Sequence, residues 1–432
     1  MASIILSFVG NQDPVSDRGT EEEGSIVTLV RYLLEEQKTT IKQIILLYTQ
    51  ETQDRAELTK GWLEDEPIQL PGDLIQLIPV SPALSLDPVN LLLAVNEARK
   101  GIATGLQYFS DGDQLEFNCS SGTPVMKSAW SALQAAGYVP HSSVWQIRNP
   151  HKKQPGQSRV FPTNVDTLKR EFDIKVIKRQ IQDYNYSGAL VTLQESNLEL
   201  GILKGLLNYA QCRISFDFDR AHTYIKPLTG FIDSKWITQI SKLSQKNQNA
   251  LIQEIYWNAL IKLNNQNYSE FLIFISAFQE RFLWMLIDDK LKIEKLPTNG
   301  NEASKFWQES VVPFDSGGLS EYLDNYRKDN GYLLKPNKKQ VPDRLVLKAI
   351  VSYFPDFKTF YDLLSKLNKA CKYRNSFVHH FEGVSEIKDL DTILVAMRNL
   401  LKEKQNFSKD NPFDMLNQEI FKLLDDFLRP LT

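Results

Sequence analysis

The chain has 432 residues, of which 42% are hydrophobic and 24% are charged, and its formal net charge is −3 at pH 7. This composition predicts a globular protein of two or three domains, and it excludes a disordered chain and nucleic-acid binding through bulk positive charge. Cys119, Cys212 and Cys371 are far apart, which argues against a disulfide framework or a cysteine zinc site. The apolar N-terminus lacks the basic start of a signal peptide, and no apolar run is long enough to span a membrane. We therefore expect a cytoplasmic protein without membrane contact.

Short apolar runs alternate with helical patterns in the first third of the chain. The runs predict strands at Ile4–Val9, Ile44–Tyr48, Leu74–Pro79, Leu115–Phe117 and Val144–Ile147. The intervening segments predict helices at Ile26–Leu34, through Leu58 and Trp62, from Pro88 to Ala98, and at Pro124–Ala136. Apolar strands separated by helices indicate a Rossmann-like parallel α/β sheet, in which ligands bind beyond the carboxyl ends of the strands.

Three loops at those strand ends carry the candidate ligand-binding residues. The loops after the first, second and fourth predicted strands contain Gly10, Asn11, Asp13, Thr49, Gln50, Asn118, Ser120, Ser121, Gly122, Thr123 and Lys127. Thr123 is placed to cap a helix that begins at Pro124, so free N–H groups, hydroxyls and Lys127 would form a phosphate cradle. The same residues are also typical of a tight strand-to-helix turn, and both interpretations stay open.

Two nucleotide motifs and the common metal motifs are absent from the sequence. Met126 stands before Lys127 where a Walker A loop requires glycine, and no GxGxxG follows the first strand. The remaining candidate metal ligands are His379, His380 and Glu382, but adjacent histidines on a helix point about 100° apart. We therefore predict no metal site.

From Asp166 onwards the pattern is helical. Helices are predicted at Leu168–Ile181, Ala189–Leu193, Leu198–Leu207, Ile237–Leu243, Leu251–Leu263, Phe271–Leu291, Arg344–Phe354, Asp356–Phe381, Leu390–Leu401 and Phe413–Leu428. Residues 149–158 predict a loop or hairpin at a domain edge, and 299–343, rich in Gly, Asn, Asp, Pro and Lys, predict a long irregular surface insertion. We assign residues 1–165 to the α/β domain, 166–298 to a helical connecting region and 299–432 to a helical domain.

Arg374 interrupts the apolar stripe of a predicted helix. The stripe includes Phe357, Leu364 and Cys371, and Arg374 falls on it one turn later. A guanidinium cannot lose its charge, so this position is costly unless a partner or an anionic ligand meets it. The alternative is an arginine that snorkels out of the core, with His379 capping the helix end.

These features together resemble a known family. The pattern Gly10-Asn11-x-Asp13-Pro14 after the first strand and Ser121-Gly122-Thr123-Pro124-x-Met126-Lys127 after the fourth resemble a CARF domain, the CRISPR-associated Rossmann-like sensor. The helical half with Arg374-Asn375-x-x-x-His379 resembles the HEPN ribonucleases. In this order they resemble the CARF–HEPN effector ribonucleases of type III CRISPR systems, and the fold class they imply is α/β plus all-α.

The resemblance implies an activity and its ligands. A cyclic oligoadenylate would bind the CARF domain through the residues named above and would switch on cleavage of single-stranded RNA, with tetra-adenylate favoured over hexa-adenylate. Arg374, Asn375 and His379 would form the ribonuclease centre, with His380 in reserve. The 2′-hydroxyl of RNA is its own nucleophile, histidine suits proton transfer near neutrality and arginine suits phosphate oxygens, so no metal is required. The expected products carry 2′,3′-cyclic phosphate and 5′-hydroxyl ends, and no stable complex with the CRISPR effector is expected.

Helix geometry adds an expectation about assembly. Residues five apart on an α-helix lie about 140° apart, so Arg374 and His379 do not share a face. One chain therefore supplies half a site, and a homodimer would supply the rest.

Two further interpretations of the function stay open. The first is a non-enzymatic CARF sensor whose helical half docks a partner, and the second is an α/β enzyme on a nucleotide with a helical lid. The CARF pocket could also degrade its own activator.

Overall fold

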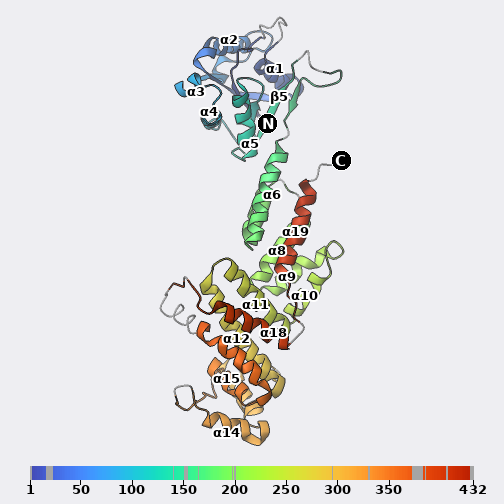
Figure 1. Ribbon diagram of the computed structural model, residues 1–432. Helices are drawn as coiled ribbons and strands as arrows, with labels where there is room; N and C mark the ends of the chain where they lie inside the picture. The colour runs from blue at the N-terminus through green and yellow to red at the C-terminus, as the bar shows by residue number, and fades with distance from the viewer. Residues whose placement is uncertain are drawn as a thin grey trace. The chain divides into compact units, whose positions relative to one another are not determined.

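The computed structural model describes residues 2–15, 23–139, 141–149, 154–163, 165–196, 198, 201–293, 295–328, 331–371, 383–384, 386–404 and 407–428. The chain divides into two compact units, Met1–Ile174 and Lys175–Thr432. The first unit is drawn in blue to green and the second in green to red (Figure 1). The described part of the second unit is helical apart from isolated bridges.

The first unit is built on one sheet. Its strands are β1 (Ala2–Phe8), β2 (Thr40–Tyr48), β3 (Ile75–Pro79), β4 (Gln114–Asn118), β5 (Ser142–Ile147) and β6 (Val160–Pro162). They lie in the order β3-β2-β1-β4-β5-β6, in which neighbours are parallel except for antiparallel β6 on β5. All of the predicted strands are present, and the predicted parallel α/β sheet is confirmed. The segment 149–158 joins an antiparallel pair, as the hairpin interpretation requires, although the short strand β6 was not predicted.

Helices cover both faces of the sheet. They are α1 (Ser25–Arg31), η1 (Tyr32–Glu36), η2 (Gln50–Thr52), α2 (Gln53–Glu64), η3 (Gly72–Leu74), α3 (Pro82–Leu86), α4 (Leu91–Gly105) and α5 (Pro124–Ala135). Alternate residues of a strand point to opposite faces. Accordingly Ile4 and Leu6 of β1 pack with α4 and α5, whereas Ile5 packs with α1 and α2. The sheet is therefore doubly wound, with a buried core on each side.

One helix start differs from the prediction. The helix expected from Pro88 begins at Leu91, because the Asn90 side chain accepts a hydrogen bond from the Leu93 N–H and caps α4. Pro88 lies in the turn between α3 and α4. Helix α1 begins at Ser25, one residue before the predicted Ile26, and α5 begins at Pro124 as predicted.

The second unit is an array of helices. They are α6 (Asp166–Gln182), which crosses from the first unit, and then α7 (Tyr186–Glu195), α8 (Gly201–Ile214), α9 (Phe218–Ile225), η5 (Lys226–Leu228), α10 (Lys235–Ser244), α11 (Gln248–Asn264), α12 (Tyr268–Leu291), α13 (Gly300–Phe306), η6 (Trp307–Val311), η7 (Phe314–Gly317), α14 (Gly318–Asn325), α15 (Arg344–Ser352), η8 (Pro355–Phe357), α16 (Lys358–Lys366), α18 (Leu390–Lys404) and α19 (Pro412–Leu428). The predicted helices in this half are present, apart from the part of 356–381 that lies outside the described residues. Within the described residues, no helix is long and apolar enough to cross a membrane.

The segment 299–343 is not an irregular insertion, and that prediction is wrong. It contains α13, η6 and α14, and its Trp307, Leu319 and Leu323 side chains are buried. The polar and glycine-rich composition hid this pattern because the apolar residues are spaced widely among caps and turns, such as the Asn299 side chain that caps α13. Tertiary packing, rather than local propensity, makes these turns helical.

Candidate functional site

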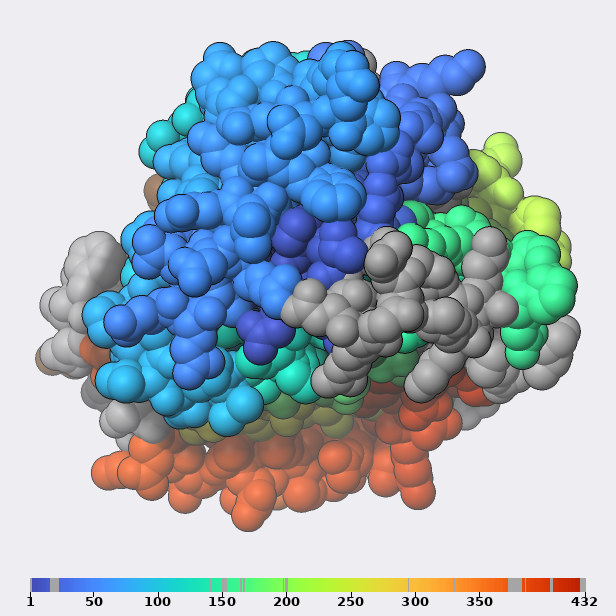
Figure 2. Space-filling model, turned by 90° about the horizontal axis from the view of Figure 1, so that it is seen from above, coloured from blue at the N-terminus to red at the C-terminus, as the bar shows by residue number. Residues whose placement is uncertain are grey.

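A cavity of about 520 Å³ opens at the carboxyl ends of the strands in the first unit. It is lined by Val9, Gly10, Asn11, Gln12, Asp13, Glu23, Gly24, Ser25, Thr49, Glu51, Thr52, Pro88, Ser120, Ser121, Gly122, Thr123, Met126, Lys127, Ile147, Arg148, Asn149 and Arg159. Residues from the start of the chain, in the darkest blue, lie recessed between later segments in the space-filling view (Figure 2). Loops after β1, β2, β4 and β5 therefore converge on one hollow, as a doubly wound sheet predicts.

Most of the predicted ligand-binding residues lie in this cavity. Gly10, Asn11, Asp13, Thr49, Ser120, Ser121, Gly122, Thr123 and Lys127 all belong to its lining. Gln50 and Asn118 do not. The Asn118 side chain is fully buried, where it donates to the Ser25 hydroxyl and accepts from the Ser120 N–H, so it shapes the loop from behind. Gln50 is exposed at the start of η2, where its N–H donates to the Ser85 hydroxyl.

Asp13 joins three segments beneath the cavity. Its carboxylate is only 2% exposed and accepts hydrogen bonds from the Gly10 N–H at 3.1 Å, the Ile26 N–H at 3.3 Å and the Ser121 hydroxyl. Burial raises the pKa of Asp13, and these three hydrogen bonds act in the opposite direction. Asp13 therefore connects the β1 loop, the start of α1 and the β4 loop, and its acceptor sites are directed at the protein.

Two glycines let the β1 and β4 loops meet. A Cβ on Gly10 would lie 2.8 Å from the Gly122 nitrogen, which is closer than real contacts allow. Gly122 has φ of +87°, a conformation that L side chains rarely adopt, and a Cβ there would lie 3.1 Å from the Cβ of Phe8. Small residues at both positions therefore leave backbone, rather than side chains, at the floor of the cavity.

The start of α5 faces the same hollow. The Thr123 hydroxyl accepts from the Met126 N–H at 3.4 Å and donates to the Pro88 carbonyl at 2.7 Å. The predicted N-cap at Thr123 and first helical residue at Pro124 are confirmed. Pro124 has no N–H, and the Met126 and Lys127 N–H groups donate to Thr123, so this helix end attracts anions through the helix dipole rather than through a row of free N–H groups. Thr123 thus orients the helix end and also ties it to the α3–α4 turn.

Three cations, Lys127, Arg148 and Arg159, line the cavity together with the carboxyl residues Asp13, Glu23 and Glu51. Lys127 is half-buried in the first turn of α5, and its charge acts on Asp13 through space. Arg148 follows β5, donates to the Ser158 carbonyl at 2.7 Å and lies over the Phe161 ring with its guanidinium carbon 3.6 Å from the centroid. These cations and the α5 N-terminus suit an anionic ligand.

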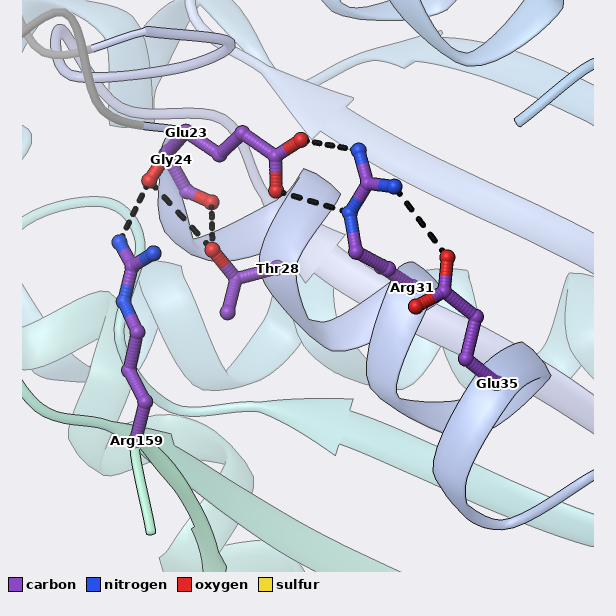
Figure 3. Close-up of polar contacts among 6 residues, drawn as sticks. All are labelled: Glu23, Gly24, Thr28, Arg31, Glu35 and Arg159. Atoms are coloured by element: carbon purple, nitrogen blue, oxygen red, sulfur yellow. Dashed lines mark hydrogen bonds and ion pairs between the residues drawn. The ribbon is translucent and has the colours of Figure 1, made fainter. Parts of the chain in front are cut away.

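A network at the start of α1 holds one wall of the cavity (Figure 3). Arg31 binds the carboxylate of Glu23 and, at 3.2 Å, that of Glu35, and these contacts raise the pKa of Arg31. Arg159 donates to the Glu23 carbonyl at 2.6 Å, and the Thr28 hydroxyl donates to the Gly24 carbonyl at 2.9 Å. Figure 3 shows these groups converging from α1 and from the start of β6. The hairpin and the helix are thereby joined beside the cavity.

Sequence reasoning missed several of the lining residues. Arg148 and Asn149 follow the fifth parallel strand, and the rule that pointed to the other loops also applies to this one. This rule could not have identified Arg159, because the position of Arg159 depends on the unpredicted strand β6. Glu23 and Ser25 enter the lining because α1 begins beside the loop that ends at Asp13.

The predicted nuclease residues Arg374, Asn375 and His379, with the reserve His380, lie outside the described residues. The helical stripe leading to them is present, since Phe357, Leu364 and Cys371 are buried. Gln279 of α12, which is fully buried, donates to the Leu364 carbonyl at 2.7 Å and accepts from the Cys371 thiol at 3.2 Å. This polar contact fixes the chain on α12 immediately before the motif.

No group of three or more potential metal ligands occurs among the residues that the structure describes. No family model matches the sequence, and no curated protein matches it.

A comparison with solved structures finds 26 matching chains. One is Enterococcus italicus Csm6 bound to cyclic hexa-2′-fluoro-hexa-dAMP, with a TM-score of 0.66 and 13% sequence identity over 98% of this chain and 100% of that chain. The likeness covers both units and agrees with the resemblance that the loop and helix motifs implied. The chain therefore has the fold of Csm6 along almost its whole length.

Proposed function

We propose that this chain is a CRISPR-associated endoribonuclease that a cyclic oligoadenylate activates. The observation that carries the proposal is the cavity at the strand ends, with its backbone floor, the α5 N-terminus and the cations Lys127 and Arg148. It occurs in a chain with the fold of Csm6, whose solved structure contains a cyclic hexa-adenylate analogue. A polyanion with bases and riboses suits such a lining. In the proposed division, residues 1–165 sense the ligand, 166–298 connect and 299–432 cleave RNA.

The cleavage chemistry is assigned to Arg374, Asn375 and His379. His379 would move the proton of the attacking 2′-hydroxyl or of the leaving oxygen, and Arg374 would stabilise the charge on the phosphorane. This chemistry needs no metal and leaves 2′,3′-cyclic phosphate and 5′-hydroxyl ends. The substrate is single-stranded RNA in the cytoplasm, and the enzyme acts without a stable complex with the CRISPR effector.

The proposed homodimer would extend the ligand-binding cavity of the first unit. An apolar patch consisting of Leu86, Val89 and Leu92 is 87%, 64% and 75% exposed, respectively. Pro88, within this patch, lines the cavity. A second copy on this patch would cover apolar surface and would extend the cavity across a two-fold axis. In that case L92D should yield monomers by light scattering, whereas V191D, at an exposed valine of α7, should leave the dimer intact. A dimeric L92D protein would argue against this interface.

Ring size is a separate question. The sequence-based preference for tetra-adenylate has no support from the Csm6 structure, in which the bound ligand is a ring of six nucleotides. Both rings therefore belong in the test. The candidates for degradation of the activator in the same cavity are Lys127, Ser121 and Asn11, of which the Ser121 hydroxyl already donates to Asp13. Chromatography of the ring after incubation with R374A protein would detect it, and an intact ring would exclude it.

The test of the whole proposal is cleavage of labelled single-stranded RNA in EDTA, with no activator, tetra-adenylate or hexa-adenylate. We expect one ring to stimulate the wild-type chain. R374A and H379A should bind the ring but lose cleavage, whereas H222A, at a histidine of α9 outside the motif, should keep it. Ring binding without cleavage by the wild type would favour the non-enzymatic sensor. Stimulation that survives in R374A would reassign the catalytic centre.

A further inference from the structure

The Arg148 side chain is layered on an aromatic ring at the wall of the cavity. Its guanidinium carbon lies 3.6 Å from the centroid of the Phe161 ring, so the group sits almost directly over the ring centre. Its Nη1 donates to the Ser158 carbonyl at 2.7 Å, which fixes the plane as well as the position. Arg148 lines the cavity, whereas Phe161 does not.

The backbone explains why this arrangement persists. β5 and β6 pair through Gln146 and Phe161, and the Arg148 N–H donates to the Arg159 carbonyl at 2.8 Å beyond the end of that ladder. Phe161 and Arg148 are therefore diagonal neighbours across an antiparallel pair, a spacing that long and aromatic side chains can bridge. The order of the guanidinium comes from the hairpin and does not require a ligand.

The other cations of the cavity wall differ from Arg148. The Lys127 ammonium is a compact charge on a flexible stem, and the Arg159 guanidinium donates to the Glu23 carbonyl. A guanidinium plane with one face on a ring presents its opposite face for stacking. Nucleobases stack on such planes in many nucleic-acid complexes.

We propose that Arg148 is a base-stacking platform, on which an adenine of the ligand lies against the guanidinium face opposite Phe161. The inference rests on the proposed function, since it gives the cyclic oligoadenylate a base-recognition subsite in addition to its phosphate contacts. A stacked base on the β5–β6 hairpin and phosphates at the α5 N-terminus would together orient the ring in the cavity.

The decisive variant is R148K, which keeps the positive charge but removes the planar face. We expect R148K to weaken binding of the preferred ring about 10-fold, in line with the energy of one stacked base. F161L should weaken it less, because the guanidinium remains but loses its support. The control is R99K. The guanidinium carbon of Arg99 in α4 lies 5.3 Å from the centroid of the Tyr138 ring, and neither residue lines the cavity, so this change should leave affinity unaltered.

A second readout separates stacking from a general loss of fold. A ring carrying 2-aminopurine in place of one adenine should lose fluorescence on binding to the wild type and should stay brighter when bound to R148K at saturation. Wild-type affinity and equal quenching in R148K would overturn the platform while leaving the proposed function standing. A wild-type chain that binds neither ring would overturn both. Melting curves of R148K should match the wild type.

Discussion

The Ser121 hydroxyl donates a hydrogen bond to the buried carboxylate of Asp13, across 108 positions of sequence. This contact ties the loop after β4 to the loop after β1, and the same carboxylate holds the N–H groups of Gly10 and Ile26. The geometry of the cavity floor thus depends on one acid that is not available to a ligand.

Removing that acid should weaken the first unit. D13A leaves two backbone N–H groups and one hydroxyl without an acceptor at a buried position, so we expect a loss of roughly 2–4 kcal/mol in the free energy of unfolding. S121A removes one of the donors and should cost less, about 1 kcal/mol. Urea titrations of both variants test the order. An equal effect of the two would mean that Asp13 does not join the three segments.

Gly122 should tolerate alanine worse than a glycine with similar backbone angles. Gly122 and Gly137 both have positive φ, +87° and +68°, but a Cβ on Gly137 would meet nothing within 4 Å. G137A should therefore show only the backbone penalty, about 1 kcal/mol. G122A should cost more, because its Cβ meets Phe8 and Met126, and should also weaken ring binding. Equal melting temperatures would contradict the close approach of the two loops.

Glu116 should make stability depend on pH. It is buried in β4, where its carboxylate accepts from the Trp145 indole at 2.6 Å and the Ser3 hydroxyl at 3.1 Å, and burial raises its pKa above 4.5. A raised pKa means that the folded chain binds the proton more tightly than the unfolded chain. This contribution to stability is therefore complete below pH 4.5 and is lost as the pH rises through the folded pKa.

The E116Q variant measures this effect. Relative to the wild type, E116Q should gain stability as the pH rises from 4.5 to 7.5, as followed by thermal unfolding at each pH. The control is E57Q, an exposed carboxyl of α2 in the same unit. A difference between E116Q and wild type that stays constant over this range would show that the Glu116 pKa is not raised.

Arg213 and Glu254 should behave as one buried unit. Both side chains are 3% exposed and make two hydrogen bonds to each other at 2.8 Å, and Arg213 also binds Tyr209 and Gln239. E254A leaves the guanidinium buried without its counterion and should cost roughly 3–5 kcal/mol. R213M/E254M should cost less than E254A, because it removes both charges. An R213M/E254M variant whose loss of stability equals the sum of the losses in R213M and E254M would contradict this coupling.

Trp307 tests whether 299–343 belongs to the core. Its side chain is 1% exposed and packs against Phe306, with ring centroids 6.0 Å apart. W307A should therefore destabilise the helical unit by roughly 3–5 kcal/mol. F231A, at a side chain that is 72% exposed, should change stability by no more than about 0.5 kcal/mol. A neutral W307A would restore the surface-insertion interpretation.

Local patterns in the sequence determined much of the α/β unit. The apolar runs at Ile4–Val9 and Ile44–Tyr48 define strands because a doubly covered sheet requires continuous apolar residues. Thr123 and Pro124 define the start of α5 through chemistry confined to one turn. Since parallel strands end at one edge of the sheet, the loops that carry Gly10 and Ser121 could be assigned to one site without coordinates.

Only the tertiary structure decided the rest, because the causes lie far apart in the chain. The role of Asp13 depends on Ser121, and the plane of Arg148 depends on Phe161 in a strand of three residues. The helices of 299–343 depend on packing of side chains such as Trp307, and the local spacing of apolar residues does not predict them. Composition and period describe neighbours along the chain, whereas burial, pKa and stacking arise from neighbours in space.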